Sequence, residues 1–200
     1  MATEGKAIFF ASSNQHKIAE MRELFAVFLP KYQLLSIVDL HLSALAVKET
    51  GKTYQENALL KAQAYLPLVA PLPVLADDSG VEVAALPGLL GIKSHRFYPG
   101  SDYQRCVHLL SLLKDKSDRR LIYQAVLCYL SPGEQPFFAS GTLEGVASWQ
   151  PSAKKAFGYD SIMIPHGHEQ TLQQLGQQVK NSISHRANAV KQLVVYLKKK

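Results

Sequence analysis

The chain has 200 residues, of which 47% are apolar and 19% are charged, and its formal net charge is +6. These proportions are typical of a soluble globular protein and exclude a disordered chain. The longest apolar run, residues 66–76, contains prolines and is shorter than the roughly 20 residues that a membrane-spanning helix needs. We see no signal peptide at the N-terminus.

The basic excess favours anionic partners, but it does not by itself distinguish a nucleotide enzyme from a nucleic-acid-binding protein. The two cysteines, Cys106 and Cys128, lie in segments with the pattern of a hydrophobic core. They are predicted to be reduced packing residues rather than a disulfide, which is typical of a cytoplasmic protein.

The hydrophobic pattern of the first part of the chain predicts alternating strands and helices. Residues 7–11 form a short buried strand, and the helix that follows ends at Pro30. A second strand covers residues 32–38, and an irregular segment covers residues 39–53. Thr53, at the end of this segment, is a suitable N-cap for a second helix.

The rest of the chain predicts a mixed α/β sheet flanked by helices, in a single domain over residues 1–200 without a separable linker. The predicted elements are strands at 74–76 and 81–83, a helix at 102–113, antiparallel strands at 121–130 and 137–146, a short strand within 157–164 and a helix at 184–198.

Two adjacent acids, Asp77 and Asp78, follow the strand at 74–76 and precede Ser79 and Gly80. One interpretation is an ordinary hairpin turn between two apolar strands. However, adjacent side chains at a strand end point to opposite sides, so at least one carboxylate faces inward or toward a cleft. An unpaired buried carboxylate is costly, and a divalent metal or a catalytic water is a usual reason to retain it.

The segment from Ser12 to Lys17 lies between the first strand and the first helix. A helix N-terminus offers free N–H groups to phosphate, and serine, asparagine and lysine add further donors. The segment lacks the glycines of a P-loop. The alternative is a helix cap by Ser13 or Asn14 beside a solvated Lys17.

Three further segments contain candidate polar groups. Asn57 and Lys61 share one helical face, for which plain solvent exposure is the alternative. A glycine between two aromatic residues, in the segment 157–160, suggests close approach to a flat ligand. The cationic segment 180–186 opens the last helix, and its His185 and Arg186 are either functional or exposed first-turn residues.

In this order, these segments resemble one family, the inosine/xanthosine triphosphate pyrophosphatases of the HAM or RdgB type. The resemblance extends from Phe10 to Val190 and rests on SSNQHKIAE, ETGKTYQENALLKA, LADDSGVEVAALPGLLGIKSHRF, FGYDS and SISHRANAV. It implies Mg²⁺-dependent hydrolysis of non-standard purine nucleoside triphosphates (ITP, dITP and XTP) to the monophosphate and pyrophosphate.

The resemblance also implies roles for individual residues. Metal binding falls to Glu49 and Asp78, with Asp77 close by, and Asp78 orients or deprotonates the attacking water. Lys61 neutralises charge on the phosphates. The remaining substrate contacts are the triphosphate site of Ser12, Ser13, Asn14 and Lys17, the nucleotide contact Ser79, the base-stacking segment Phe157, Gly158, Tyr159 and Asp160, and the purine-pocket residues Lys180, His185 and Arg186.

For the fold, the resemblance implies a long mixed sheet with helices on both sides, in two lobes with the active cleft between them. It also implies a homodimer, without a membrane or a specific nucleic acid as partner. The chain departs from the family pattern at Lys48, in residues 93–97, in residues 152–156 and at Ser161. Two alternatives therefore stay open: a basic nucleotide- or nucleic-acid-binding protein with reduced catalysis, and an enzyme that prefers other nucleotides, including modified pyrimidines.

Overall fold

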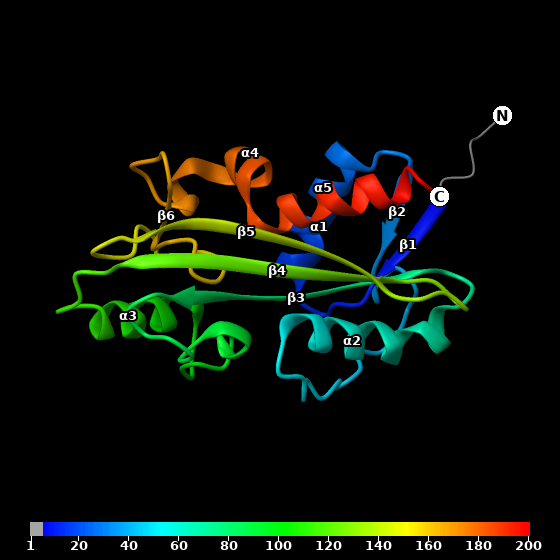
Figure 1. The fold of residues 1–200 in the computed structure, drawn as a ribbon, viewed down its shortest axis with the longest axis horizontal. Helices are drawn as coiled ribbons and strands as arrows, with labels where there is room; N and C mark the ends of the chain where they lie inside the picture. Colours follow the sequence, from blue (N-terminus) through cyan, green and yellow to red (C-terminus); the bar gives the residue numbers. More distant parts are fainter. Residues whose placement is uncertain (1–5) are drawn as a thin grey trace. The chain divides into compact units, whose positions relative to one another are not determined.

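The computed structural model describes residues 6–200, whose strands form one six-stranded sheet in the order β2-β1-β3-β4-β5-β6 (Figure 1). Strand β1 pairs in parallel with β2 and β3, whereas β6 pairs antiparallel with β5, so the sheet is mixed. The predicted α/β fold is therefore confirmed. The strands are β1 (Lys6–Phe10), β2 (Tyr32–Leu35), β3 (Val74–Val83), β4 (Arg120–Leu130), β5 (Phe137–Ala147) and β6 (Met163–Pro165).

The helices are α1 (Gln15–Phe28), α2 (Tyr54–Val69), α3 (Asp102–Leu112), α4 (Leu172–Ile183) and α5 (His185–Leu197), with a short 3₁₀ helix η1 (Gly91–Lys93). The first three lie between strands along the chain, and α4 and α5 follow β6. Thr53 caps α2 as predicted, because its side chain accepts the Glu56 N–H at 3.1 Å. Within residues 6–200, no helix combines the length and the apolar character that crossing a membrane requires.

Internal contacts divide the chain into two compact units. Unit 1 contains the chain up to Asp78 together with residues 125–141 and 186–200, and unit 2 contains residues 79–124 and 142–185. Strands β3, β4 and β5 each contribute residues to both units. The single domain and the cleft between two lobes stay predictions.

In unit 1, side chains of β3 alternate between two hydrophobic clusters. Leu75 packs with residues of α1 and α5, including Met21 and Leu193. Its neighbours Val74 and Ala76 pack instead with residues of α2. Figure 1 shows α2 and α5 on opposite sides of these strands. The alternation follows from the period of two in a strand, and it sets the direction of the two acids that come next.

In unit 2, a third cluster joins Val81 and Val83 of β3 to Cys106 and Leu109 of α3. Strand β6 and helix α4 contribute Met163 and Leu172 to the same cluster. Both cysteines of the chain are buried and free, which confirms their prediction as reduced packing residues.

The hairpin interpretation of residues 77–80 is wrong, because these residues lie inside the continuous strand β3. Asp77 and Asp78 find ionic partners in the neighbouring helices, so polar side chains remain in the interior of the strand. Tertiary contacts thus override the local preference of Asp-Ser-Gly for a turn.

Other boundaries also differ from the prediction. Strand β2 ends at Leu35 instead of residue 38, because the Asp39 carboxylate accepts the Ser36 N–H at 2.7 Å and forms a turn there. Helix α4 was not predicted: its sequence is rich in glutamine, and Gly176 at φ 80° interrupts its helical backbone. The short strand predicted within 157–164 is limited to Met163–Pro165, since the residues before it form turns.

Candidate functional site

The two adjacent acids of β3 point to opposite faces of the sheet in unit 1. The Asp77 carboxylate lies 2.6 Å from the Lys17 ammonium of α1 and 3.5 Å from Nε of Arg186 of α5. The Asp78 carboxylate faces α2 and lies 2.9 Å from the Lys61 ammonium. This divergence is what the alternation of side chains along a strand predicts. We call these side chains, together with Glu49, the β3 cluster.

The start of α1 brings Lys17 to Asp77. Asn14 is the N-cap, and its Oδ1 accepts the N–H groups of His16 and Lys17 at 3.0 and 3.2 Å. Ser12 in turn accepts the Asn14 N–H at 3.2 Å, so the loop is held by its own side chains. The cap interpretation is therefore confirmed for Asn14, whereas the interpretation of Lys17 as a solvated side chain is wrong.

Burial and the mutual attraction of the two charges have opposite effects on the pKa values of Lys17 and Asp77. Burial lowers the pKa of Lys17, against the opposing effect of the Asp77 carboxylate, and the nearby charges of Arg186 and Lys61 lower it further. Burial alone would raise the pKa of Asp77, but the charges of Lys17 and Arg186 hold it well below its usual range. Asp77 is therefore ionised and holds Lys17 in a fixed position.

Arg186 is buried at the start of α5, so its interpretation as an exposed first-turn residue is wrong. Its Nη1 lies 3.1 Å from a carboxylate oxygen of Glu20, which is also buried. The sequence analysis missed Glu20. Its position in the sequence could have revealed it: Glu20 lies on the same helical face as the apolar Met21 and Leu24, which predicts that this carboxylate is buried.

On the other face of β3, the Lys61 ammonium donates hydrogen bonds to three oxygen atoms. It donates to Glu49 at 3.1 Å, to Asp78 at 2.9 Å and to the backbone carbonyl of Asp77 at 2.7 Å. Burial alone would lower the pKa of Lys61, but Asp78, Asp77 and Glu49 together raise it. Burial raises the pKa of Asp78 by more than the neighbouring Lys61 lowers it.

Asn57 connects this face to the loop that carries Glu49. It is fully buried, so the interpretation of its helical face as plain solvent exposure is wrong. Its amide donates to Asp78 at 3.3 Å, and its Oδ1 accepts the Gly51 N–H at 2.8 Å. A Cβ atom at Gly51 would lie 2.6 Å from that Oδ1, so only glycine allows this close approach.

The oxygen atoms of Glu49 and Asp78 already surround one cation, the Lys61 ammonium. Carboxylate oxygens are the ligands that Mg²⁺ prefers, and this ion keeps several waters, so two carboxylates suffice to hold it. The part of the chain in residues 6–200 contains no group of three His, Cys, Asp or Glu side chains arranged for a metal. The Asp77 carboxylate is engaged by Lys17 and Arg186, so Glu49 and Asp78 are the donors that fit magnesium best.

In unit 2, the predicted base-stacking residues form a tight turn that we call the 157–160 loop. The Asp160 N–H donates to the Phe157 carbonyl at 3.1 Å, and Gly158 adopts φ +58°. Asp160 is buried, and its carboxylate accepts from Lys180 at 2.7 Å and from the Tyr123 hydroxyl at 3.3 Å. The Lys180 ammonium also lies 5.2 Å from the centroid of the Phe157 ring.

The other predicted nucleotide-binding residues of unit 2 lie in helices or strands. His185, the first residue of α5, is buried with its ring edge-on to Tyr123 at 4.9 Å. It is therefore not an exposed first-turn residue. Ser79 lies in β3 and is half-buried. The sequence analysis did not single out Tyr123, because a tyrosine in an apolar strand is typical of a core residue.

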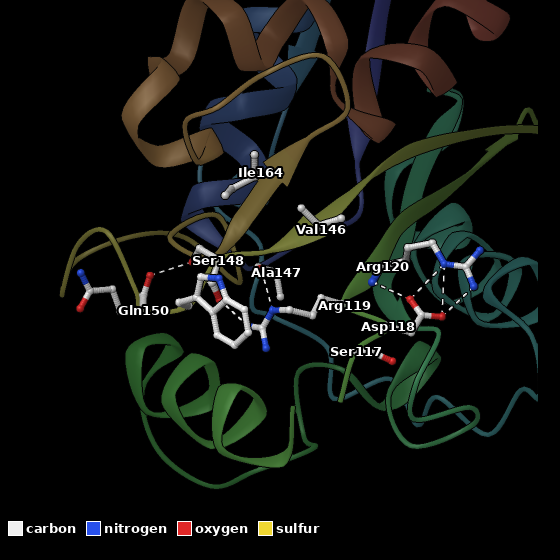
Figure 2. A pocket seen from close by; sticks show the side chains of 10 residues that line it. Ser117, Asp118, Arg119, Arg120, Val146, Ala147, Ser148, Gln150 and Ile164 are labelled. Atoms are coloured by element: carbon white, nitrogen blue, oxygen red, sulfur yellow. Dashed lines mark hydrogen bonds and ion pairs between the residues drawn. The ribbon is translucent and has the colours of Figure 1, made fainter. Parts of the chain in front are cut away.

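Unit 2 also contains an open pocket of about 620 Å³ at the beginning of β4 and the end of β5 (Figure 2). Figure 2 shows Asp118 and Arg120 facing each other at its edge. The guanidinium of Arg119 donates to the backbone carbonyls of Leu113, Ala147 and Ser148. None of the predicted site residues lines this pocket, and its two arginines bond to backbone carbonyls and to Asp118.

Comparison with known proteins extends the resemblance to nearly the whole chain. The model of the Ham1 family matches residues 8–196. This chain belongs to the Ham1 family. Among its relatives, the dITP/XTP pyrophosphatase of Staphylococcus aureus is 38% identical, and the alignment covers 96% of each chain. That of Oceanobacillus iheyensis is 36% identical, with 96% of this chain and 98% of the relative covered.

Solved structures of Ham1 proteins have the same fold. The Ham1 protein of Staphylococcus aureus superimposes with a TM-score of 0.83 at 36% identity, and the HAM1 protein of Coxiella burnetii with a TM-score of 0.81 at 33% identity. Each comparison covers 97% of this chain and 99% of the other.

Proposed function

We propose that this Ham1 protein is a pyrophosphatase that hydrolyses dITP, ITP and XTP to the nucleoside monophosphate and pyrophosphate, with Mg²⁺ as cofactor. The observation that carries the proposal is the β3 cluster, in which two half-buried lysines flank two adjacent buried carboxylates on opposite faces of one strand. Relatives that match over nearly their full length bear the name dITP/XTP pyrophosphatase.

Phosphoanhydride hydrolysis places negative charge on the oxygens around the reacting phosphorus, so positioning and cationic stabilisation supply most of the catalysis. Lys17 and Lys61 are held by carboxylates before any substrate binds, so little reorganisation is needed. We assign the triphosphate to these two lysines, with donors from Ser12, Ser13 and Asn14 at the start of α1.

We assign two roles to Asp78: it orients the attacking water, and it accepts a proton from this water. Glu49 and Asp78 are the residues that would hold Mg²⁺. When bound, this ion supplies positive charge to the phosphate oxygens. Asn57 donates to one oxygen of Asp78 and thereby fixes the direction in which that carboxylate points.

The purine is assigned to the 157–160 loop, with Lys180, His185 and Arg186 as further pocket residues. Hypoxanthine and xanthine carry an oxygen at C6, whereas adenine carries an amino group there. A buried donor such as the Lys180 ammonium loses its partner and meets another donor when adenine enters. Such a polar mismatch discriminates by up to about 10⁴–10⁵.

We further propose that the protein is cytoplasmic and forms a homodimer, following the family resemblance. Its basic character serves the nucleotide substrate, and we assign it neither a membrane nor a specific nucleic acid as partner.

A panel of nucleoside triphosphates tests the proposed activity. We expect dITP, ITP and XTP to give monophosphate and pyrophosphate, with ATP and pyrimidine triphosphates at least about 100-fold slower in kcat/KM. Removal of divalent metal by EDTA should abolish turnover, and added Mg²⁺ should restore it, because Glu49 and Asp78 then regain their cation. The measurement is product analysis by chromatography. Orthophosphate as the first product would contradict the assignment, and saturable binding without turnover would favour a binding protein.

The pocket at Arg119 provides a separate test of where the nucleotide binds. Trp149 is 76% exposed and stacks on Arg119, which keeps its three backbone acceptors when the ring is removed. We therefore expect Trp149→Ala to leave kcat and KM for dITP within about twofold of wild type. A large rise in KM in steady-state kinetics would place part of the substrate in this pocket and refute the assignment to the 157–160 loop.

A further inference from the structure

Helix α3 holds the 157–160 loop by both polar groups of one residue, Gly158. The Gly158 N–H donates to Oδ2 of Asp102 at 2.7 Å. The Gly158 carbonyl accepts the thiol of Cys106, whose Sγ lies 3.4 Å away. Asp102 is the first residue of α3 and Cys106 follows one turn later, so the two groups lie on the same side of the helix.

The Asp102 carboxylate is itself held in place. Its second oxygen, Oδ1, forms an ion pair with Arg105, and the same guanidinium donates to the Gly100 carbonyl at 2.7 Å. Ser101 caps the helix through a reciprocal pair of hydrogen bonds with Gln104. The acceptor for Gly158 therefore has a fixed position before any ligand binds.

The second contact depends on a protonated thiol. Burial raises the pKa of Cys106 to about 11, so the thiol keeps its proton at neutral pH and can donate to Gly158. The Ser161 hydroxyl donates to the Cys106 sulfur at 3.5 Å, which connects the residue after the loop to the same helix.

Hydrogen bonds, rather than crowding, fix the backbone at Gly158. A Cβ built at this residue would meet no atom within 4 Å, although its φ of +58° favours glycine. The Gly158 N–H belongs to the same planar peptide unit as the Phe157 Cα. An acceptor that fixes this N–H therefore also fixes the plane from which the Phe157 side chain projects.

We propose that Asp102 is a positioning residue that sets the Phe157 ring for stacking on the base, and thereby controls affinity for the nucleoside part of the substrate. This inference rests on the proposed role of Phe157 as the base-stacking residue. Asp102 acts through the Gly158 N–H, and Arg105 keeps its carboxylate aligned. The phosphate contacts of the β3 cluster do not depend on it.

The test compares Asp102→Ala with wild type. Losing a charge-assisted acceptor should raise KM for dITP and XTP about tenfold, while kcat changes less than about threefold. The inhibition constant of inorganic tripolyphosphate, which lacks a base, should stay within about twofold. Asp102→Asn keeps an oxygen that can accept the Gly158 N–H, so it should recover most of the lost affinity. Asp118→Ala, at an exposed site of the same unit, is the matched control and should leave all three constants unchanged.

A double-mutant cycle with Phe157→Ala shows whether Asp102 acts through this ring. If it does, Asp102→Ala should add less than about twofold to the KM of Phe157→Ala. Additive effects, an equal rise in the tripolyphosphate constant, or an Asn variant as weak as the Ala variant would overturn the proposal. Should Asp102→Ala not fold, as judged by its melting curve, Asp102→Glu takes its place, because its longer side chain displaces the acceptor.

The kinetics of the two single variants distinguish a failure of the positioning role of Asp102 from a failure to place the base at the 157–160 loop. If Phe157→Ala raises KM and Asp102→Ala does not, the positioning role is refuted and the assignment of the base to the 157–160 loop stands. If Phe157→Ala itself leaves KM for dITP unchanged, the base assignment fails and the positioning role fails with it.

Discussion

Replacing Asp78 by Asn is expected to slow pyrophosphate release from dITP at least about 100-fold, with the melting temperature retained within a few degrees. Asparagine has nearly the size and shape of aspartate, but it neither accepts a proton from water nor supplies a negative charge for Mg²⁺. The loss should therefore appear mainly in kcat, measured at saturating dITP and Mg²⁺.

The fold should tolerate this change because the charge of Asp78 is unfavourable in the folded protein. Burial raises the pKa of Asp78, so the folded state holds the proton of this carboxyl at pH values where the unfolded chain has released it. Stability from this group is thus present at low pH and decreases as pH rises through the raised pKa. The neutral amide removes that cost, and Lys61 keeps Glu49 and the Asp77 carbonyl as acceptors.

Asp118→Asn is the matched control, since it makes the same chemical change at an exposed ion pair with Arg120. It should leave both the rate and the melting temperature unchanged. Melting curves are recorded in EDTA, so that lost metal binding is not mistaken for lost folding. An Asp78→Asn enzyme that works at the wild-type rate would remove Asp78 from the mechanism.

The sequence predicted the fold best where local periodicity determines the structure. The alternation along β3 predicted that Asp77 and Asp78 diverge, and the structure places them toward different helices. The caps at Asn14 and Thr53 were recognised because their hydrogen bonds are made within three residues. The family resemblance identified Lys17 and Lys61 as functional residues, and the structure places them beside these two acids.

Contacts between distant segments were not predictable in the same way. Asn57 was interpretable as exposed, since a polar helical face gives no sign that a buried carboxylate 21 residues away will cover it. Gly158 and Asp102 are 56 residues apart, so neither segment alone indicates that they bond. Helix α4 was not predicted, although Leu172, Leu175 and Val179 recur at helical spacing, because glutamines separate them and Gly176 interrupts the helical backbone.

Arg186→Met is expected to give the largest loss of stability among the changes considered. Arg186 is buried between the carboxylates of Glu20 and Asp77, at 3.1 and 3.5 Å. Methionine keeps much of the apolar stem but leaves Glu20 buried without this charge. Removing one partner of a buried pair typically costs about 3–5 kcal/mol. For a chain of this size, that corresponds to a fall of roughly 6–20 °C in melting temperature.

A second substitution distinguishes loss of the ion pair from loss of packing. Glu20→Gln combined with Arg186→Met removes the buried charge that the single variant leaves behind, so the double variant should melt above Arg186→Met. Arg120→Met, at the exposed pair with Asp118, is the control and should melt within about 2 °C of wild type.

The pH dependence of this loss has a definite sign. Lys17 and Arg186 hold the pKa of Asp77 below its usual range, so ionised Asp77 stabilises the fold above the ordinary carboxyl pKa and this contribution is lost on acidification. Arg186→Met has less of this contribution to lose, because one of the two cations that lower the pKa of Asp77 is absent. The difference in melting temperature between wild type and Arg186→Met should therefore shrink between about pH 7 and about pH 3. A difference that stays constant over this range would show that Arg186 stabilises the protein by packing and not by its charge.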